Sequence, residues 1–432
     1  MGIIKFYKTL LICVFLLISM VFFGQAGKSD TVRLTLNSTD SLFLSKNLQL
    51  IAEKYNIEVS KAQIIQAKLF TNLTFSLEQN IYNPQEKQWF PISDSGETSV
   101  QIQKVLRLAG QRSKQVKLAK LNTEKEEQNY FDLLRTLKFT LHSTLFNIYY
   151  LNRSMNIYTR ETDALKHIIS VFEQQLNNGY VSKAEVLRLK AELFSIENEK
   201  YGLFSQLVAA QGDMNVLLHT SGVFYFPAFN KGTLSFRNPD SLHLQVLIDT
   251  ALANRYDYKM AQMDVSIGEM NLKYQKALGA PAFALMAGWD KNGSYVHNYN
   301  YIGFQVDLPW FNINQGNIKS AKFIIESNKA KLQTAADQVR NDVVQAYSLA
   351  LENQKLVSHF DESFSAELDQ TIAEYIKNYE KHNISLLEFL DYYDAYKQNA
   401  VQYNTFQFNR MNSLENLNLV VGKDVCRIHE NK

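Results

Sequence analysis

Two long stretches of the chain carry apolar residues at gaps that alternate between three and four, with polar residues on the faces between them. These stretches are residues 111–178 and 317–421, and neither contains a glycine or a proline. Alternating gaps are typical of a coiled-coil seam, and glycine and proline are the usual residues that end a helix. The pattern predicts very long helices, since about 65 helical residues would reach about 100 Å. In the second stretch the predicted seam runs from Leu332 to Tyr379, interrupted once at polar Asn353.

Upstream of each long stretch lies a pair of shorter segments in which apolar and polar residues alternate one by one. Residues 71–82 and 98–108 form the first pair, and residues 281–290 and 299–310 form the second. Alternation over roughly 9 to 12 residues is typical of a membrane-spanning β-strand with one apolar face, but a soluble hairpin has the same period. We therefore expect two hairpins in either environment. The loops expected to close them are polar: 83–97 and 291–298.

Each long helix is expected to end in a short polar turn with the same capping pattern. Ser182 is followed three residues later by Glu185, and Ser385 by Glu388, at a constant offset of 203 residues. Ser-x-x-Glu is a capping box, so we expect a second helix to return from each turn. In the second turn, Asn383 is the residue expected to tolerate a left-handed backbone.

The order helix, strand, loop, strand, very long helix, turn and return helix occurs twice, which predicts two copies of one unit. A glycine precedes each long helix at a matching place, Gly110 in the first copy and Gly316 in the second. The boundaries that follow are a signal segment 1–26, a first repeat 27–218, a connector 219–241, a second repeat 242–422 and a tail 423–432.

The segment 1–26 has the composition of a cleaved secretory signal peptide. Two lysines precede an apolar core at 10–23, and small residues favour cleavage after Ala26. A membrane anchor needs about 20 apolar residues, and this core is shorter. Cys13 lies inside the core rather than at its end, so we do not expect lipidation. Cys426 is then the one remaining cysteine, and an internal disulfide is not expected.

Composition argues against several classes of function. The net charge is only +2 and basic residues are not interleaved with aromatic ones in a patch, so nucleic acid is not an expected partner. The eight histidines are scattered, and no phosphate loop or nucleophile motif occurs. We therefore expect neither an enzyme nor a cofactor. Met260, Met263 and Met270 have helical spacing, which is more typical of core packing than of a soft-metal site, so no bound metal is expected.

This order of elements resembles the TolC-type outer-membrane efflux family. The resemblance is carried by the turn motif Gly179-x-x-Ser182-x-x-Glu185-x-Leu187, by Tyr379 followed by Ser385-x-x-Glu388-x-Leu390, and by the run Asp307-Leu308-Pro309-Trp310-Phe311 with Gly316 after it. It implies an α+β membrane protein that forms a homotrimer. Four strands from each protomer would complete a twelve-stranded outer-membrane β-barrel, and long antiparallel coiled-coil hairpins would form a periplasmic α-barrel.

The resemblance also implies roles for particular residues. The two turns would be periplasmic tips that contact an adaptor protein through Gly179, Val181, Ser182, His382, Asn383, Ile384 and Ser385. The family's gate positions match Glu388 and Asp391, and a hydrogen bond between Tyr379 and Glu185 would help to hold the closed state. The turns from barrel to helix match Gly110, Pro309 and Gly316. From the residues alone, the favoured interpretation of the acidic pair is a capping glutamate on a solvated helix face, and the gate is the alternative that the resemblance implies.

The function implied is a passive exit duct of a tripartite efflux or secretion system. Its expected partners are further copies of the chain, a periplasmic adaptor (membrane fusion) protein, an inner-membrane pump of the resistance-nodulation-division or ABC type, and outer-membrane lipid. Its expected location is the cell outer membrane, with a large periplasmic part. The alternative is a periplasmic coiled-coil scaffold without a pore. The exported substrate (a drug, a metal ion or another small molecule) and the class of pump stay open.

Overall fold

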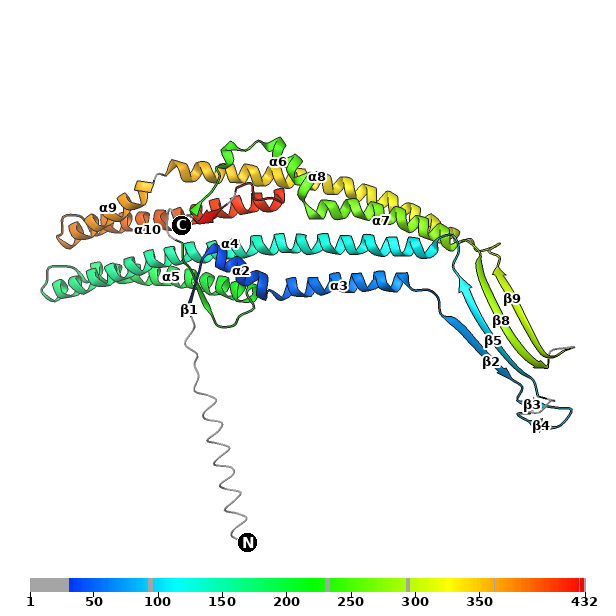
Figure 1. Cartoon of the computed structure of the whole chain (residues 1–432). Coiled ribbons are helices and arrows are strands. Elements are labelled where there is room, and N and C mark those ends of the chain that lie inside the picture. Colours follow the sequence, from blue (N-terminus) through cyan, green and yellow to red (C-terminus); the bar gives the residue numbers. More distant parts are fainter. Residues whose placement is uncertain are drawn as a thin grey trace, which may run out of the picture.

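The computed structural model describes residues 31–91, 96–229, 234–292, 296–360, 362–426 and 428–430. The molecule is a long rod of helices with a four-stranded sheet bent away at one end and two helical hairpin tips at the other (Figure 1). The expected signal peptide, residues 1–26, lies outside the described residues. Within the described part, no helix is both long enough and apolar enough to cross a membrane.

The first predicted long helix is confirmed. Helix α4 (Gln111–Asn177) has 67 residues and runs most of the length of the rod (Figure 1). Its apolar stripe is buried at spacings of three and four, first at Leu141, Leu145 and Ile148 and then at Leu165, Ile168 and Phe172. Each fully buried side chain of this size contributes about 1.5–3 kcal/mol. The neighbours of α4 are α3 (Leu48–Lys68), α5 (Lys183–Leu217), α7 (Tyr256–Leu278) and α10 (Leu386–Val421).

The second predicted long helix is not continuous, so that expectation was wrong. Helix α8 (Gln315–His359) ends at Phe360, whose backbone is extended, and α9 (Glu362–Glu380) follows it. The two parts pack against different partners. Val339 and Val343 of α8 lie in a cluster with α6 (Leu244–Asn254), whereas Ile372 and Tyr379 of α9 lie in a cluster with the first hairpin. Asn353, where the predicted seam is interrupted, lies inside α8, before this change of partner.

Two further helices are broken by a residue with extended backbone. Asn47 separates α2 (Leu36–Lys46) from α3, and Arg255 separates α6 from α7. Asn47 caps α3 by accepting from Leu50 N at 3.0 Å and donates to Leu217 O at 2.9 Å. Each break therefore lies where a polar side chain joins its helix to another part of the chain.

The four predicted strands are confirmed and form one antiparallel sheet, in the order β2-β5-β8-β9. Its register pairs Val100 with Trp289 and Leu285 with Phe304. The loop expected at 83–97 contains an additional small hairpin of two short strands. The strands are β2 (Leu73–Gln79), β3 (Tyr82–Asn83), β4 (Gln88–Trp89), β5 (Thr98–Leu106), β8 (Ala282–Asn292) and β9 (His297–Asp307).

The connector expected at 219–241 does more than join two halves. It pairs with the first described residues of the chain in a parallel ladder, β1-β6, and with the last ones in an antiparallel ladder, β7-β10. Both ladders lie near the middle of the rod (Figure 1). The elements are β1 (Thr31–Leu34), β6 (Phe224–Pro227), β7 (Leu234–Ser235), the 3-10 turn η1 (Pro239–Ser241) and β10 (His429–Glu430).

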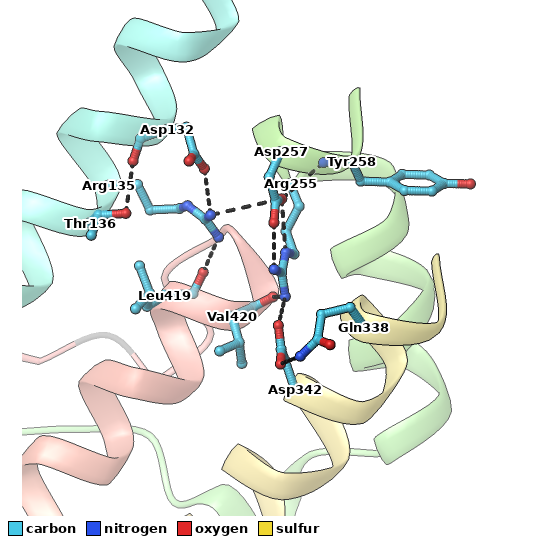
Figure 2. Close-up of polar contacts among 10 residues, drawn as sticks. All are labelled: Asp132, Arg135, Thr136, Arg255, Asp257, Tyr258, Gln338, Asp342, Leu419 and Val420. Carbon is cyan, nitrogen blue, oxygen red and sulfur yellow. Dashed lines mark hydrogen bonds and ion pairs between the residues drawn. The ribbon is translucent and has the colours of Figure 1, made fainter. Parts of the chain in front are cut away.

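Two arginines hold the C-terminal end of α10 against three other helices (Figure 2). Arg255 Nη1 donates to Asp342 Oδ2 on α8 at 2.8 Å, and Arg135 Nη1 of α4 donates to Leu419 O at 2.6 Å. Asp257 at the start of α7 lies between them, paired with Arg255. The last carbonyls of a helix have no hydrogen-bond partner within the helix. The two guanidinium groups donate to carbonyl oxygens at the end of α10 and so supply the missing partners.

Candidate functional sites at the hairpin tips and the sheet

The first tip, between α4 and α5, has the local structure that its sequence predicts. Gly179 adopts a left-handed backbone with φ of 77°. Ser182 Oγ accepts from Glu185 N at 3.2 Å, and Glu185 Oε2 accepts from Ser182 N at 2.9 Å. The predicted capping box is therefore confirmed. Val181 is half-buried, whereas Gly179 and Ser182 are exposed at the end of the rod.

The second tip, between α9 and α10, departs from its predicted structure in two respects. The left-handed residue is His382, with φ of 58°, and not Asn383. Ser385 Oγ accepts from Glu388 N at 3.2 Å, but the return contact from the Glu388 carboxylate is not formed. The second capping box is therefore only half present. Ile384 is half-buried against the first hairpin's cluster, and His382, Asn383 and Ser385 are exposed.

Aromatic rings join the two tips. Phe172 of α4 stacks on Tyr379 of α9 with ring centroids 4.8 Å apart, and Tyr379 stacks on Phe389 of α10 at 4.4 Å. Two tilted ring contacts extend this cluster: Phe389 with Tyr393 at 5.3 Å between centroids, and Phe172 with His382 at 5.6 Å. The contact between the hairpins at this level is thus aromatic.

The predicted hydrogen bond between Tyr379 and Glu185 is absent. Tyr379 Oη is buried without a hydrogen-bond partner among the described residues. The Glu185 carboxylate is used in the capping box with Ser182. Burial, and then the negative charge of Glu185, raise the pKa of Tyr379 far above its ordinary value. The Tyr379 hydroxyl and the Glu185 carboxylate are close enough to interact electrostatically, but the hydroxyl forms no hydrogen bond among the described residues.

The predicted acidic gate residues lie on the exposed face of the first turns of α10. Glu388 and Asp391 are both exposed and three residues apart, which places them on one helix face. In the described part of the chain, neither carboxylate has a hydrogen bond or an ion pair. Both are therefore available to face either bulk solvent or an equivalent surface of another protomer.

The turns between sheet and helices are built by left-handed residues. Gly110, with φ of 66°, precedes α4 as expected. The matching residue before α8 is Asn314, with φ of 64°; Gly316 lies inside the first turn of α8, so its expected place in the turn was wrong. Asn314 is held by donating from Nδ2 to Gln275 O at 2.8 Å. Pro309 lies between β9 and α8, half-buried.

One face of the sheet is apolar and bare. Phe75, Ile302 and Phe304 are exposed, Ile302 by 89%. Large aromatic side chains lie bare near both ends of the strands, with Trp310 and Phe311 beside the helices and Trp89 and Phe90 at the far hairpin. An apolar face of this extent, bare in one protomer, marks a surface that is covered by something else.

The other face of the sheet is polar and has a close-packed pair. Tyr301 lies across Gly288, and a Cβ at Gly288 would come within 2.5 Å of the tyrosine ring. Tyr301 Oη donates to Gln101 Oε1 at 3.1 Å. A ring covering a strand glycine helps to fix the register of the sheet. Gly288 and Tyr301 are thus site residues that the sequence did not single out.

The fold has clear relatives among solved structures. CusC matches with a TM-score of 0.73 over 93% of this chain and 96% of that chain, at 16% identity. The Campylobacter jejuni CmeC outer membrane channel matches with a TM-score of 0.74 over 90% and 86%, at 15% identity. The outer membrane protein VceC from Vibrio cholerae matches with a TM-score of 0.71 over 90% and 96%, at 14% identity. The chain has the TolC-type fold.

The resemblance to the TolC-type family that the sequence indicated is thereby confirmed at the level of the fold. No protein-family model and no curated protein matches the chain. The matched structures are outer-membrane channels and not enzymes. At 14–16% identity the likeness concerns the fold alone, so residue roles at the tips rest on the geometry described above.

Within this TolC-type fold, the predicted site residues fall into two groups at opposite ends of the rod. The tip residues of both hairpins gather at one end, and Gly110 and Pro309 lie at the other, beside the sheet (Figure 1). Sequence reasoning missed Phe172 and Phe389, which make the contact between the tips. Their apolar spacing was visible, but nothing local in the sequence shows that one stripe meets the other.

Proposed function

We propose that the protein is the outer-membrane exit channel of a tripartite efflux or secretion system. The observation that carries the proposal is the sheet: four strands with a bare apolar face and two open edges, at the end of a helical rod (Figure 1). Open strand edges in lipid leave backbone groups without partners, so a membrane sheet has to close. Three copies would give a closed barrel of twelve strands, and their helices would continue the duct through the periplasm.

The proposed channel is passive, and the rest of the system supplies energy and selects substrate. In this proposal the hairpin tips contact a periplasmic adaptor protein, through Gly179, Val181, Ser182, His382, Asn383, Ile384 and Ser385. The adaptor connects the tips to an inner-membrane pump. The chain is exported by its N-terminal segment, which is cleaved, and inserts in the outer membrane.

Assembly and location provide the first test. The channel proposal expects the protein in the outer-membrane fraction, released only by detergent, and cross-linked or native mass measurements should give a homotrimer. The alternative, a periplasmic scaffold without a pore, expects a protein that is extracted without detergent. A stable monomer in detergent would remove the channel proposal.

We further propose that Glu388 and Asp391 line the constriction of the closed trimer. Three copies would place six carboxylates in two rings, which attract cations in a narrow passage. Neutralising both residues (Glu388→Gln with Asp391→Asn) should lower cation selectivity and weaken block by divalent cations in planar lipid bilayers. The fold should survive, because Ser385 Oγ caps the backbone of α10 without using the Glu388 carboxylate. Unchanged divalent block would mean that the two carboxylates face bulk solvent.

A further inference from the structure

The end of the rod that meets the sheet is rich in basic residues. The chain passes between helices and sheet four times, in the segments 59–77, 98–123, 270–289 and 308–325 (Figure 1). Together these segments contain twelve lysines and arginines and no aspartate or glutamate, although the net charge of the whole chain is only +2. The lysines and arginines of the four segments form the basic collar of the molecule.

Carboxylates lie elsewhere on the sheet. Asp307, at the end of β9 beside the collar, pairs with Ala282 and so belongs to the polar face of the sheet. At the far end of the sheet, the described acidic residues outnumber the lysines: Glu78, Glu86, Glu97 and Asp290 against Lys87 and Lys291. Positive charge is therefore concentrated at the helix end of the sheet.

Lys104 joins the basic collar to the apolar face of the sheet. The register pairs Lys104 with Leu73 on β2 and with Leu285 on β8, and Leu285 pairs in turn with Phe304 on β9. Cross-strand partners point to the same face, so this lysine lies in an apolar row. Its ammonium group donates to the backbone oxygen of Thr71, on the helix side of β2. A lysine stem that follows an apolar surface and directs its charge to the boundary is typical of a membrane interface.

Exposed aromatic side chains lie at the same level as the collar. Trp310 and Phe311 follow β9, and Phe70 precedes β2; all three are exposed. The Arg112 guanidinium lies 3.8 Å from the centroid of the Phe70 ring, and its Nε donates to Lys68 O at 2.7 Å. Aromatic rings beside basic side chains are typical of the level of lipid headgroups.

We propose that the basic collar binds the headgroups of anionic phospholipids at the periplasmic surface of the outer membrane, with Lys104 as its lipid-facing residue. The inference rests on the proposed outer-membrane channel. A phosphatidylglycerol headgroup carries an uncompensated negative charge, whereas phosphatidylcholine carries its own cation. The apolar row beside Lys104 would contact the acyl chains, which a free phosphate ion lacks. Each basic residue near an anionic membrane surface adds about fivefold in affinity.

Quenching of tryptophan fluorescence by brominated lipids measures which lipid lies beside the collar. The chain has three tryptophans, and Trp89→Phe with Trp289→Phe leaves Trp310, next to the collar, as the reporter. The full-length protein is reconstituted in phosphatidylcholine vesicles that contain brominated phosphatidylglycerol or, as the reference, brominated phosphatidylcholine. We expect phosphatidylglycerol to bind about fivefold more tightly, and this preference to shrink at high salt because exposed charges are screened. Equal quenching by the two lipids would overturn the proposal.

Variants test whether the preference comes from the collar. Lys104→Gln should bring the ratio of the two lipid affinities close to one, and Lys104→Arg should keep it. Lys291→Gln is the control, because Lys291 lies at the far end of β8 in the same sheet; an equal fall there would mean general attraction to the protein surface and would overturn the collar site. Reduced stability of Lys104→Gln with an unchanged ratio would show that Lys104 serves only to bind Thr71, and would also overturn it.

A second variant covers the case in which Lys104→Gln does not assemble. Arg112→Gln removes the charge beside Phe70: a lowered preference for phosphatidylglycerol supports the proposal, and an unchanged preference overturns it. Excess inorganic phosphate separates a lipid site from a simple anion site. We expect it to leave the quenching by brominated phosphatidylglycerol largely unchanged, and complete displacement would overturn the assignment to lipid.

Failure of the collar and failure of the channel give different results. A protein that enters vesicles of neither composition would remove the proposed outer-membrane channel itself. A protein that inserts and conducts, but binds both phospholipids equally, would remove only the lipid site at the collar.

Discussion

At the scale of single residues, Tyr379 lies buried in the contact between the tips without using its hydroxyl. A buried polar group without a partner costs about 1–3 kcal/mol. The ring, by contrast, stacks on both Phe172 and Phe389. The tyrosine therefore stabilises the contact between the tips through its ring and in spite of its oxygen.

This predicts opposite effects for two substitutions. Tyr379→Phe should keep or raise the unfolding free energy, by up to about 1 kcal/mol, and leave the conductance unchanged. Tyr379→Ala should lower the unfolding free energy by about 3–5 kcal/mol, because a large buried ring is lost. Chemical denaturation together with bilayer recording measures both. A rise in conductance for Tyr379→Phe would contradict this prediction. It would indicate that the hydroxyl does form the hydrogen bond to Glu185 that the family resemblance implied.

His142 is a second residue with a testable consequence. It is 7% exposed, and its ring nitrogens lie 2.8 Å from Asp40 Oδ1 on α2 and 2.9 Å from Glu415 Oε1 on α10. Lys138 also faces Asp40, at 3.3 Å. Burial alone would lower the pKa of His142, but the hydrogen bonds to the two carboxylates outweigh it and raise the pKa from 6.5 to about 9. The charged imidazolium thus fastens α2 to the rod.

The stability of the protein should follow this titration. A raised histidine pKa contributes stability that is complete below about pH 6.5 and is lost as the pH rises through about 9. The contribution is about 3 kcal/mol at most. The unfolding temperature should therefore fall between pH 6.5 and 9 in the wild type, and His142→Gln should be less stable at pH 6 and largely lack this fall. An equally steep fall in the variant would assign the effect to other groups.

Some residue-scale features could be predicted and others could not. The Ser182–Glu185 box is a contact over three residues, so the sequence contains all of it. The stack of Phe172 on Tyr379 joins positions more than two hundred residues apart and depends on how the two hairpins are rotated. Local periodicity contains no such information. The resemblance to the TolC-type family indicated Tyr379 but implied a contact through its hydroxyl, whereas the structure shows a contact through its ring.

At the scale of elements, the junction between helices and sheet has the least room for a side chain among the described glycines. Gly279 ends α7, and a Cβ there would lie 2.4 Å from Ile313 O, on the segment that leads into α8. The neighbouring atom is backbone, which cannot move aside cheaply. The approach of these two segments sets where β8 and β9 leave the helices.

Gly279→Ala should therefore destabilise the protein and reduce the yield of assembled trimer, measured by thermal unfolding and native mass. Gly202→Ala is the control, because Gly202 lies inside α5 with open space around its Cα. Alanine in a helix interior is better than glycine by about 0.5–1 kcal/mol, so the control should be stabilised. Equal behaviour of the two variants would show that the junction tolerates a shift.

Among the helices and strands too, those specified by nearby residues could be predicted, and those that depend on tertiary contacts could not. The four strands could be predicted because a sheet with one apolar and one polar face requires apolar and polar residues to alternate one by one along each strand. The break between α8 and α9 was missed because no glycine or proline marks it. Val339 and Tyr379 carry the same stripe in sequence but face different clusters, so the break arises from tertiary packing.

At the scale of the whole molecule, the proposed assembly in a membrane depends on the bare apolar face of the sheet. Phe304 is 72% exposed on the apolar face of β9, and Gln305 points to the other face. In a membrane, arginine at a lipid-facing position costs about 2–4 kcal/mol near the midplane. Phe304→Arg should therefore block insertion, while Gln305→Arg should insert, measured by heat-modified mobility and membrane fractionation. Equal tolerance at the two positions would mean that this face does not meet lipid.

The first long helix, the positions of the two hairpin turns and the four strands could be predicted from the chain, because each is specified by nearby residues. The trimer and its closed barrel remain proposals, since the edges of β2 and β9 show only that something has to complete the sheet.

The ladders β1-β6 and β7-β10 bring both ends of the described chain to the middle of the rod, far from the sheet and from the tips (Figure 1). This has a practical use. A fluorescent or affinity label fused after the last residue would lie near the middle of the rod, away from both the sheet and the hairpin tips. Such a label offers a handle for imaging or purification that leaves both working ends untouched.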